Sequence, residues 1–375
     1  MEQTSIKCSI MRGGTSKAVF LRQEDLPTIP AERDRLVLRL FGSPDPRQID
    51  GLGGADILTS KLAIIGPSSV ADADVDYLFG QVGIDKGEIN YHENCGNIIS
   101  AVGVYAVQEG LIDADKRETR VRVNNLNTGK IIDVFVPMHG GEPAVAGEFS
   151  IDGVPGTGAE VWVDFRNSAG ASTGSVLPTG NVVDELFIPE FSRKVRVSIV
   201  DVGKVTLFFH AAEAGVEGTE RPDQFTAEVL ERFWAIRMAA ARLIGMPLNS
   251  ALPTPVSLIL PVAHRLFLED RMLDASECDL IGRRVFGPPP KLHKAFAGTG
   301  AVCTAVAALI PGTVAHEVTR QQTPGLIRLG HPSGVFRVRA RVEVVNGEIQ
   351  VQEASYSRTV RRLMQGDAFV PAGLQ

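Results

Sequence analysis

Short apolar runs, separated by turn-forming glycines and prolines, dominate the chain and predict many short strands. In the first half these runs cover residues 8–11, 18–21, 62–65, 76–82, 87–91, 121–123, 131–136 and 160–165. Two segments there, residues 31–41 and 98–108, are predicted to be helices instead. The small and polar residues 170–180 are typical of a loop or linker. This mixture predicts an α+β fold.

The pattern starts again after that linker, which indicates a diverged internal repeat. Residues 195–200 lead into Asp201-Val-Gly203, as residues 6–11 lead into Arg12-Gly-Gly14. Both turns are followed by a further apolar strand. The two halves of the chain are therefore predicted to be copies of one unit.

The helices repeat as well. An apolar helix over residues 301–310 follows Gly298-Thr-Gly300, as the helix over residues 98–108 follows Cys95-Gly-Asn97. A further strong helix is predicted between them, over residues 226–243. We expect two similar domains, residues 1–185 and 186–375, each a mostly antiparallel sheet wrapped around a central helix. The C-terminal tail is free to pack back on the first domain, and the active site is expected in the cleft between the domains.

Composition narrows the range of functions. A length of 375 residues fits two domains of ordinary size, and the net charge of −6 disfavours partners such as nucleic acid or an anionic membrane. No apolar stretch approaches the roughly 20 residues of a membrane span, and the first residues lack the pattern of a signal peptide. The four cysteines show no CxxC or other zinc-ligand spacing, so we expect no metal site and a cytoplasmic location.

The segment Asn94-Cys-Gly-Asn97 is the most informative local feature. It places a thiol directly before a helix, where the positive end of the macrodipole makes a thiolate easier to form. The free N–H groups of the first helical turn can also hold a carboxylate. A base and an anion pocket in one place suit proton abstraction next to a carboxylate. The alternative is a free cysteine packed as a small core residue.

Ten segments between about residue 6 and about residue 366 resemble those of one known family in their number, order and spacing. They are Met11-Arg-Gly-Gly-Thr-Ser-Lys17, Gly42-Ser-Pro-Asp-Pro-Arg-Gln-Ile-Asp-Gly51, Leu58-Thr-Ser-Lys-Leu-Ala-Ile64, Asp74-Val-Asp-Tyr77, Asn94-Cys-Gly-Asn97, Ile151-Asp-Gly-Val-Pro-Gly156, Leu177-Pro-Thr-Gly-Asn181, Leu292-His-Lys294, Ile310-Pro-Gly-Thr313 and His331-Pro-Ser-Gly334. Together they resemble the PrpF and methylitaconate Δ-isomerase family, which has the diaminopimelate-epimerase-like fold. The resemblance implies a cofactor-independent isomerase of small unsaturated di- or tricarboxylates.

The resemblance assigns acid/base chemistry to Lys61, within Thr59-Ser-Lys61. A lysine in an apolar pocket loses its proton more readily, because burial disfavours the charged form. The alternative is a solvated lysine at the start of a strand, the usual place for this residue type. Cys95 is the second candidate, and which of the two removes the substrate proton stays open.

One departure separates this chain from the racemases and epimerases of the same fold, which use two cysteines, one before each helix. Ala297 stands at the second of these positions, so a symmetric two-thiol racemase is disfavoured. Cys303 falls inside the predicted second helix, where packing is its expected role.

Several further residues are candidates for holding the substrate carboxylates, because they supply cations, hydroxyls, amides or backbone N–H groups. They are Arg12, Ser16, Lys17, Asn94, Gly96, Asn97, Gly298, Thr299, Gly300, His331 and Ser333. The first three stand in a glycine-rich turn that resembles the substrate loop of the family, and the alternative for that turn is a solvated loop. The basic residues Lys291, His293 and Lys294 either raise the potential near the second helix or form a solvated strand edge.

The expected reaction is a 1,3-allylic proton shift on a substrate of the methylitaconate or methylaconitate type. The alternatives are a 4-oxalomesaconate tautomerase and a non-catalytic carboxylate-binding protein. We expect no cofactor, no nucleic-acid or membrane partner, and a homodimer as the assembly that the resemblance implies.

Overall fold

The computed structural model describes residues 2–92, 94–115, 117–247, 252–269, 271–287 and 289–372. The chain forms two compact units. Unit 1 runs to Val163 and resumes at Ser357, and unit 2 comprises Asp164–Tyr356.

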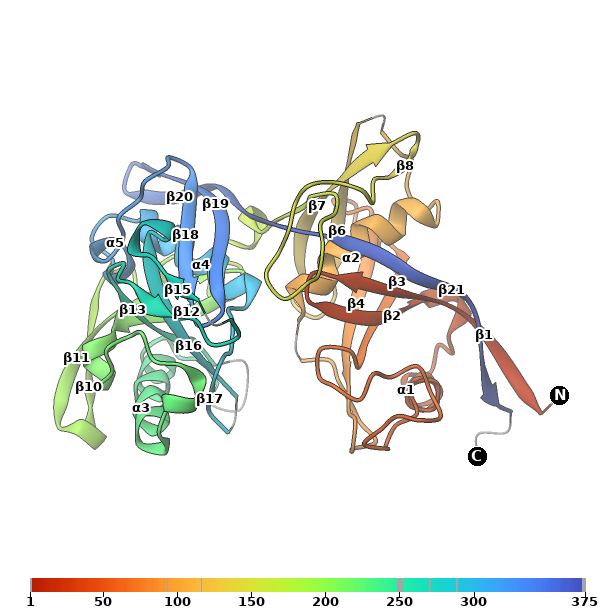
Figure 1. Ribbon diagram of the computed structural model, residues 1–375, viewed down its shortest axis with the longest axis horizontal. Coiled ribbons are helices and arrows are strands. Elements are labelled where there is room, and N and C mark those ends of the chain that lie inside the picture. The colour runs from red at the N-terminus through yellow and green to blue at the C-terminus, as the bar shows by residue number, and fades with distance from the viewer. Residues whose placement is uncertain are drawn as a thin grey trace. The chain divides into compact units, whose positions relative to one another are not determined.

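Unit 1 is a curved sheet with two helices. Its strands are β1 (Gln3–Gly13), β2 (Ser16–Arg22), β3 (Lys61–Pro67), β4 (Val75–Val82), β5 (Ile89–Asn90), β6 (Glu118–Asn125), β7 (Lys130–His139), β8 (Glu142–Pro143), β9 (Val161–Asp164) and β21 (Val360–Pro371). Its helices are α1 (Pro30–Phe41), α2 (Gly96–Gln108) and the 3₁₀ turn η1 (Gln23–Asp25). The strand β21, from the far end of the chain, lies antiparallel beside β1 (Figure 1).

Unit 2 contains the remaining elements. Its strands are β10 (Asp184–Ile188), β11 (Arg193–Val202), β12 (Lys204–His210), β13 (Thr254–Ile259), β14 (His264–Arg265), β15 (Met272–Leu273), β16 (Leu280–Phe286), β17 (Lys291–Leu292), β18 (Leu326–His331), β19 (Gly334–Val345) and β20 (Glu348–Arg358). Its α-helices are α3 (Ala227–Leu243), α4 (Gly298–Leu309) and α5 (Val314–Glu317). Its 3₁₀ turns are η2 (Arg166–Ser168), η3 (Pro189–Phe191), η4 (Ala211–Ala214), η5 (Pro222–Gln224) and η6 (Ala275–Glu277).

The two units share one topology. In unit 1 the neighbouring strands β1, β2, β3, β4, β6 and β7 pair in the order antiparallel, parallel, antiparallel, parallel, antiparallel. The strands β11, β12, β13, β16, β18 and β19 of unit 2 pair in the same order. The helices α1 and α3 occupy the first parallel crossover, and α2 and α4 the second. The predicted α+β fold of two similar, mostly antiparallel domains is confirmed.

Strand alternation explains how the sheet of unit 1 holds a helix on each face. Val19 and Leu21 of β2 pack in the same apolar cluster as Val37 and Phe41 of α1. Phe20 points to the opposite face, where its ring lies 5.2 Å from that of Tyr105 in α2. Because α2 is apolar on all sides and almost entirely buried, it belongs inside the curve of the sheet, as Figure 1 shows.

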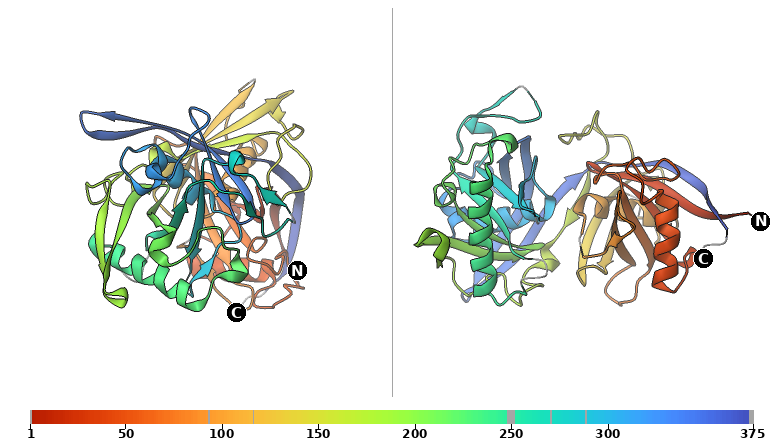
Figure 2. Two further views of the ribbon diagram at one scale, coloured as in Figure 1. Left: turned by 60° about the vertical axis from the view of Figure 1, so that its left-hand side comes forward. Right: turned by 90° about the horizontal axis from the view of Figure 1, so that it is seen from below.

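Unit 2 follows the same arrangement. On one face of its sheet, α3 begins at the N-cap Thr226, and the ring of Phe233 meets that of Phe209 edge to face at 5.1 Å. On the other face, the apolar helix α4 is buried from Gly300 to Ala308. The two helices of this unit are seen from further sides in Figure 2.

The boundary between the units lies at Val163, earlier than the expected residue 185. The backbone and carboxylate of Asp201 explain the difference, because together they hold residues 170–176 on unit 2. The N–H of Gly170 donates to the backbone oxygen of Asp201 at 2.7 Å, and the N–H of Asp201 donates to that of Val176 at 2.9 Å. Asp201 is fully buried and accepts hydrogen bonds from the backbone N–H groups of Ser172 (2.7 Å) and Thr173 (2.9 Å). A buried carboxylate needs such partners, so this loop is an integral part of the second unit.

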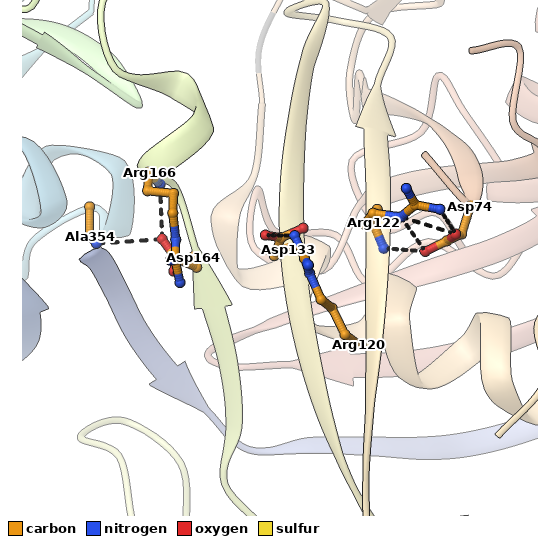
Figure 3. A network of polar contacts seen from close by, with 7 residues as sticks. All are labelled: Asp74, Arg120, Arg122, Asp133, Asp164, Arg166 and Ala354. Atoms are coloured by element: carbon orange, nitrogen blue, oxygen red, sulfur yellow. Dashed lines mark hydrogen bonds and ion pairs between the residues drawn. The ribbon is translucent and has the colours of Figure 1, made fainter. Parts of the chain in front are cut away.

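Ion pairs fasten several strand ends (Figure 3). Arg122 of β6 donates to both carboxylate oxygens of Asp74, with the shortest distance 2.6 Å, and ties the segment before β4 to β6. Burial raises the pKa of Asp74, but the hydrogen bonds and charge of Arg122 outweigh it and lower the pKa. In unit 2, Asp164 pairs with Arg166 and accepts from the backbone of Ala354 at 3.4 Å. The Asp74 carboxylate therefore has a structural role in unit 1.

Candidate active site

Cys95 lies at the N-cap of α2, with extended backbone angles of φ −126° and ψ 100°. Its side chain makes no cap hydrogen bond, and the sulfur lies 3.8 Å from the hydroxyl oxygen of Ser16. Cys95 is half-buried, whereas Cys8, Cys278 and Cys303 are buried. Its thiol therefore stands at a helix N-terminus, where first-turn N–H groups lack intrahelical partners.

The turn between β1 and β2 is fixed against this helix start. Gly14 has a φ of +52°, and a Cβ at this position would lie 2.4 Å from Oδ1 of Asn97. Both the backbone conformation and the lack of space therefore favour glycine. The Asn97 amide donates to Oγ1 of Thr15 at 3.0 Å and accepts from Nε of Arg358 at 2.7 Å. These contacts bring the start of β2, with Ser16, beside the thiol.

Arg12 braces the same turn. Its Nη1 donates to the backbone oxygens of Gly14 (3.0 Å) and Thr359 (2.8 Å). Burial, with the nearby charge of Arg361, lowers the pKa of Arg12. The guanidinium thus carries positive charge next to the candidate site while it holds the turn. Direct contact between Arg12 and substrate stays a prediction.

Lys61 is the first residue of β3 and is 7% exposed. Its ammonium donates to Oε1 of Gln81 at 2.6 Å and lies 5.3 Å from the ring centre of Phe79. Gln81 in turn donates to the backbone oxygen of Ser60 at 2.8 Å. The lysine is thus held by a neutral amide and an aromatic face.

The sheet gathers these residues at one end of unit 1. Parallel pairing sets Leu62 of β3 beside Val19 of β2, so Lys61 lies next to the strand start that carries Ser16 and Lys17. The backbone N–H of Lys17 donates to the oxygen of Leu58 at 2.9 Å. At the same helix start, Asn94 accepts a hydrogen bond from the buried Asn125 at 2.9 Å.

Gln81 was not among the residues that the sequence pointed to, because its role depends on the register of β3 and β4, which pairs it with Lys61. We expect Gln81→Leu to lower turnover about tenfold, since the lysine loses the amide oxygen that accepts its hydrogen bond while the substrate contacts remain. In Gln81→Glu a carboxylate favours the charged ammonium, so the pH profile of turnover is expected to move to higher pH. Unchanged profiles in both variants would show that Gln81 does not position Lys61.

Gly298, Thr299 and Gly300 form the first turn of α4, after the N-cap Ala297. The turn glycine Gly203, with a φ of +68°, packs over Thr299 as Gly14 packs over Asn97. The second unit thus repeats the helix N-terminus of the first without its thiol.

His331 and Ser333 belong to the tight turn between β18 and β19, and both are buried. The backbone N–H of Ser333 donates to Nδ1 of His331 at 3.1 Å, and its hydroxyl donates to the backbone oxygen of Lys294. These contacts hold the turn to the segment that leads into α4. Contact of either residue with substrate stays a prediction.

The three basic residues before α4, Lys291, His293 and Lys294, differ in their burial. Lys291 and Lys294 are exposed, as in a solvated strand edge, whereas His293 is half-buried and accepts from the backbone of Ala295 at 3.0 Å. Burial, reinforced by the charge of Arg284, lowers the pKa of His293 to about 4.

A pH effect on stability follows from His293. The folded protein keeps this imidazole neutral at a pH where the unfolded chain, with a histidine pKa of about 6.5, already binds a proton. The contribution of His293 to the free energy of unfolding is complete above about pH 7. It is lost as the pH falls from 6.5 toward 4, and the loss reaches about 2–3 kcal/mol at pH 4.5. Urea unfolding at pH 7.5 and 4.5 should therefore show that the free energy of unfolding falls less in His293→Asn than in the wild type. Asparagine keeps a hydrogen-bond acceptor for the N–H of Ala295. Equal losses in both proteins would count against this assignment.

Across the described ranges, no helix is long and apolar enough to cross a membrane. Within those same residues, no group of three or more histidine, cysteine, aspartate or glutamate side chains is placed to hold a metal ion.

Comparison with known proteins identifies close relatives over nearly the whole chain. The family described as "PrpF protein" matches residues 3–371. The chain is 43% identical to a 3-methylitaconate isomerase of Eubacterium barkeri and 39% identical to a 2-methyl-aconitate isomerase of Shewanella oneidensis, each match covering 98% of both sequences. A crystal structure of methylitaconate-delta-isomerase superposes with a TM-score of 0.90 at 43% identity, covering 99% of this chain and 97% of the other.

Proposed function

The chain belongs to the PrpF protein family, and we propose that it is an isomerase that moves the double bond of a small unsaturated di- or tricarboxylate by a 1,3-proton shift. Relatives of 39–43% identity that carry isomerase names support this reaction class. The observation that carries the proposal is the position of Lys61. It is buried, held by a neutral amide, and lies at the same end of unit 1 as Ser16 and the N-terminus of α2 with Cys95.

The reaction requires two proton transfers and no other exchange. A proton leaves the allylic carbon, an enolate-like anion forms, and a proton returns at the other end of the three-carbon unit. The difficulty is the charge that builds up on a substrate that is already negative. We assign the lowering of this cost to the N–H groups of the first turn of α2 and to the charge of Arg12, because fixed donors and cations stabilise developing negative charge.

Lys61 and Cys95 are the residues to which we assign the two transfers. The ammonium or amine of Lys61 is a donor or acceptor within a rigid strand, and the thiol of Cys95 is free of cap bonds. Ser16, beside the sulfur, has a hydroxyl that can bind a substrate carboxylate or the reacting thiolate. Because the reaction is redox-neutral and transfers no group, its balance needs no cofactor. A homodimer and a cytoplasmic location, both expected from the sequence, stay predictions.

Proton NMR in D₂O tests the proposal. Purified protein is incubated separately with methylitaconate, 2-methylaconitate, trans-aconitate and 4-oxalomesaconate. We expect deuterium at an allylic carbon together with a shifted double bond for at least one of them. 4-Oxalomesaconate as the sole substrate would favour the tautomerase alternative. Binding without exchange for all four, with folded protein, would overturn the proposal in favour of a non-catalytic carboxylate-binding protein.

A further inference from the structure

One edge of β4 is shared by two strands that cover different parts of it. The opposite edge is occupied by β3, which pairs with β4 from Val75 to Gln81. On the shared edge, β6 pairs with β4 as far as Tyr77, and β5 pairs with Gln81 and Val82. Phe79 lies between these limits, so the register of β5 and β6 leaves its backbone outside both ladders.

The side chain of Asn127 closes this gap. Asn127 follows β6 in the turn to β7, and its amide makes hydrogen bonds with backbone atoms only. Its Oδ1 accepts from the N–H of Phe79 at 2.8 Å, and its Nδ2 donates to the carbonyl oxygen of Phe79 at 2.8 Å. The same Nδ2 donates to the carbonyl oxygen of Tyr91 at 2.8 Å. One amide thus takes the place of a strand residue and also holds the chain just after β5.

Asn125 holds the turn that carries this amide. Asn125 is fully buried, and its Oδ1 accepts from the N–H groups of Asn127 (3.0 Å) and Thr128 (3.2 Å). The N–H of Gly129 donates to the backbone oxygen of Asn125 at 2.8 Å. The Nδ2 of Asn125 donates to Oδ1 of Asn94 at 2.9 Å. The turn is therefore held by its own hydrogen bonds and presents two amides to the residues between β5 and α2.

The two backbone partners of Asn127 lead to the two residues to which we assign proton transfer. The ammonium of Lys61 lies over the ring of Phe79, 5.3 Å from its centre. Tyr91 stands four residues before Cys95 in the chain. A single side chain therefore links the strand beside Lys61 to the segment that leads to Cys95.

We propose that Asn127 is a positioning residue that sets Cys95 relative to Lys61 through the backbones of Phe79 and Tyr91. This inference rests on the proposed function, in which Lys61 and Cys95 carry the two proton transfers. Asn127 itself moves no proton. Displacement of a reacting group by about 1 Å can cost about a hundredfold in rate, so hydrogen bonds remote from the substrate can control turnover.

Asn127→Asp tests the proposal with a side chain of the same shape. A carboxylate still accepts from the N–H of Phe79, but it cannot donate to the two carbonyl oxygens and is repelled by them. We expect kcat to fall about tenfold or more while KM changes less than about threefold, since the groups that bind the substrate carboxylates remain. Without substrate, hydrogen–deuterium exchange should be faster in peptides that contain the first turn of α2, because Tyr91 has lost this partner.

Asn124→Ala is the matched control. Asn124 lies at the same end of β6 and is buried, but its Nδ2 donates to the carboxylate of Asp76 at 2.8 Å. Both variants should lower the free energy of unfolding, because each loses buried hydrogen bonds. Asn124→Ala should nevertheless keep kcat within about threefold of the wild type and leave exchange at the first turn of α2 unchanged. Asn127→Ser, whose shorter side chain cannot span both partners, is the second variant if the aspartate variant does not fold.

Unchanged kcat in a folded Asn127 variant would overturn the proposal. An equal loss of kcat in Asn124→Ala would also overturn it, since that result indicates a general effect of lost stability. The proposed function is tested separately, because it fails only if the wild type isomerises none of the unsaturated polycarboxylates. Even then, exchange at the first turn of α2 shows whether Asn127 holds the segment before Cys95: faster exchange supports this role, and unchanged exchange overturns it.

Discussion

Lys61→Ala is expected to lower turnover more than tenfold, and toward the range of about 10²–10⁴ that a positioned acid or base contributes. The ammonium lies at the start of β3, against Gln81 and the face of Phe79. Its loss removes one of the two groups to which we assign proton transfer, while the N–H groups of α2 that we expect to bind the substrate remain. KM should therefore change much less than kcat.

Two further variants make this result interpretable. Lys61→Met keeps the length and the apolar packing of the side chain, so a loss of turnover there reflects lost chemistry. Lys7→Met alters a lysine on β1 that is exposed and 4.0 Å from Glu109, and it should be fully active. The measurement is the initial rate of double-bond shift, with circular dichroism as the check of folding. Full turnover in folded Lys61→Met would exclude Lys61 from proton transfer.

Cys95→Ala is also expected to lower turnover more than tenfold, because the thiol is the second group that can move a proton at this site. Among the four cysteines, Cys95 alone is not buried, so iodoacetamide should inactivate the wild type by alkylation at this position. The matched control is Cys8→Ala, since Cys8 lies in the same unit but is buried in β1, where burial raises its pKa.

Deuterium exchange can then divide the two proton transfers between the residues. A variant that exchanges the allylic proton of the substrate without shifting the double bond retains the residue that removes the proton and lacks the one that returns it. A variant that does neither has lost the first base. Retained turnover in Cys95→Ala, with inactivation by iodoacetamide unchanged, would contradict a catalytic role for this thiol.

Much of the fold could be predicted because its signals are local. The helices α1, α2 and α3 were expected within two residues of where they begin, since apolar spacing and flanking glycines mark them. The helix α4 begins at Gly298, before the expected residue 301, because weak helix formers are tolerated in a first turn. The strands β13, β16 and β18 to β21 were not predicted. Distance in sequence accounts for β21, whose partner β1 stands at the other end of the chain, whereas β18, β19 and β20 pair with their neighbours in sequence.

Part of the candidate site could likewise be predicted from the sequence, and part of it could not. Lys61 and Cys95 stand in recognisable segments, and their neighbourhood at one end of the sheet follows from the pairing of β2 with β3. Gln81 lies within an apolar strand and has no local signature. It gains its role from Lys61 on the paired strand. Such a residue can be identified only when strand register and burial are known.

The pairing of β21 with β1, from Gln3 opposite Pro371 to Gly13 opposite Val360, has a consequence for biosynthesis. Unit 2 is one continuous stretch of chain, whereas unit 1 takes its β21 strand from a segment that follows all of unit 2. The chain of unit 2 is therefore complete before β21 is synthesised, and the edge of β1 lacks this partner strand until β21 is made. Unit 1, which carries Lys61 and Cys95, is thus the later of the two units to complete its sheet.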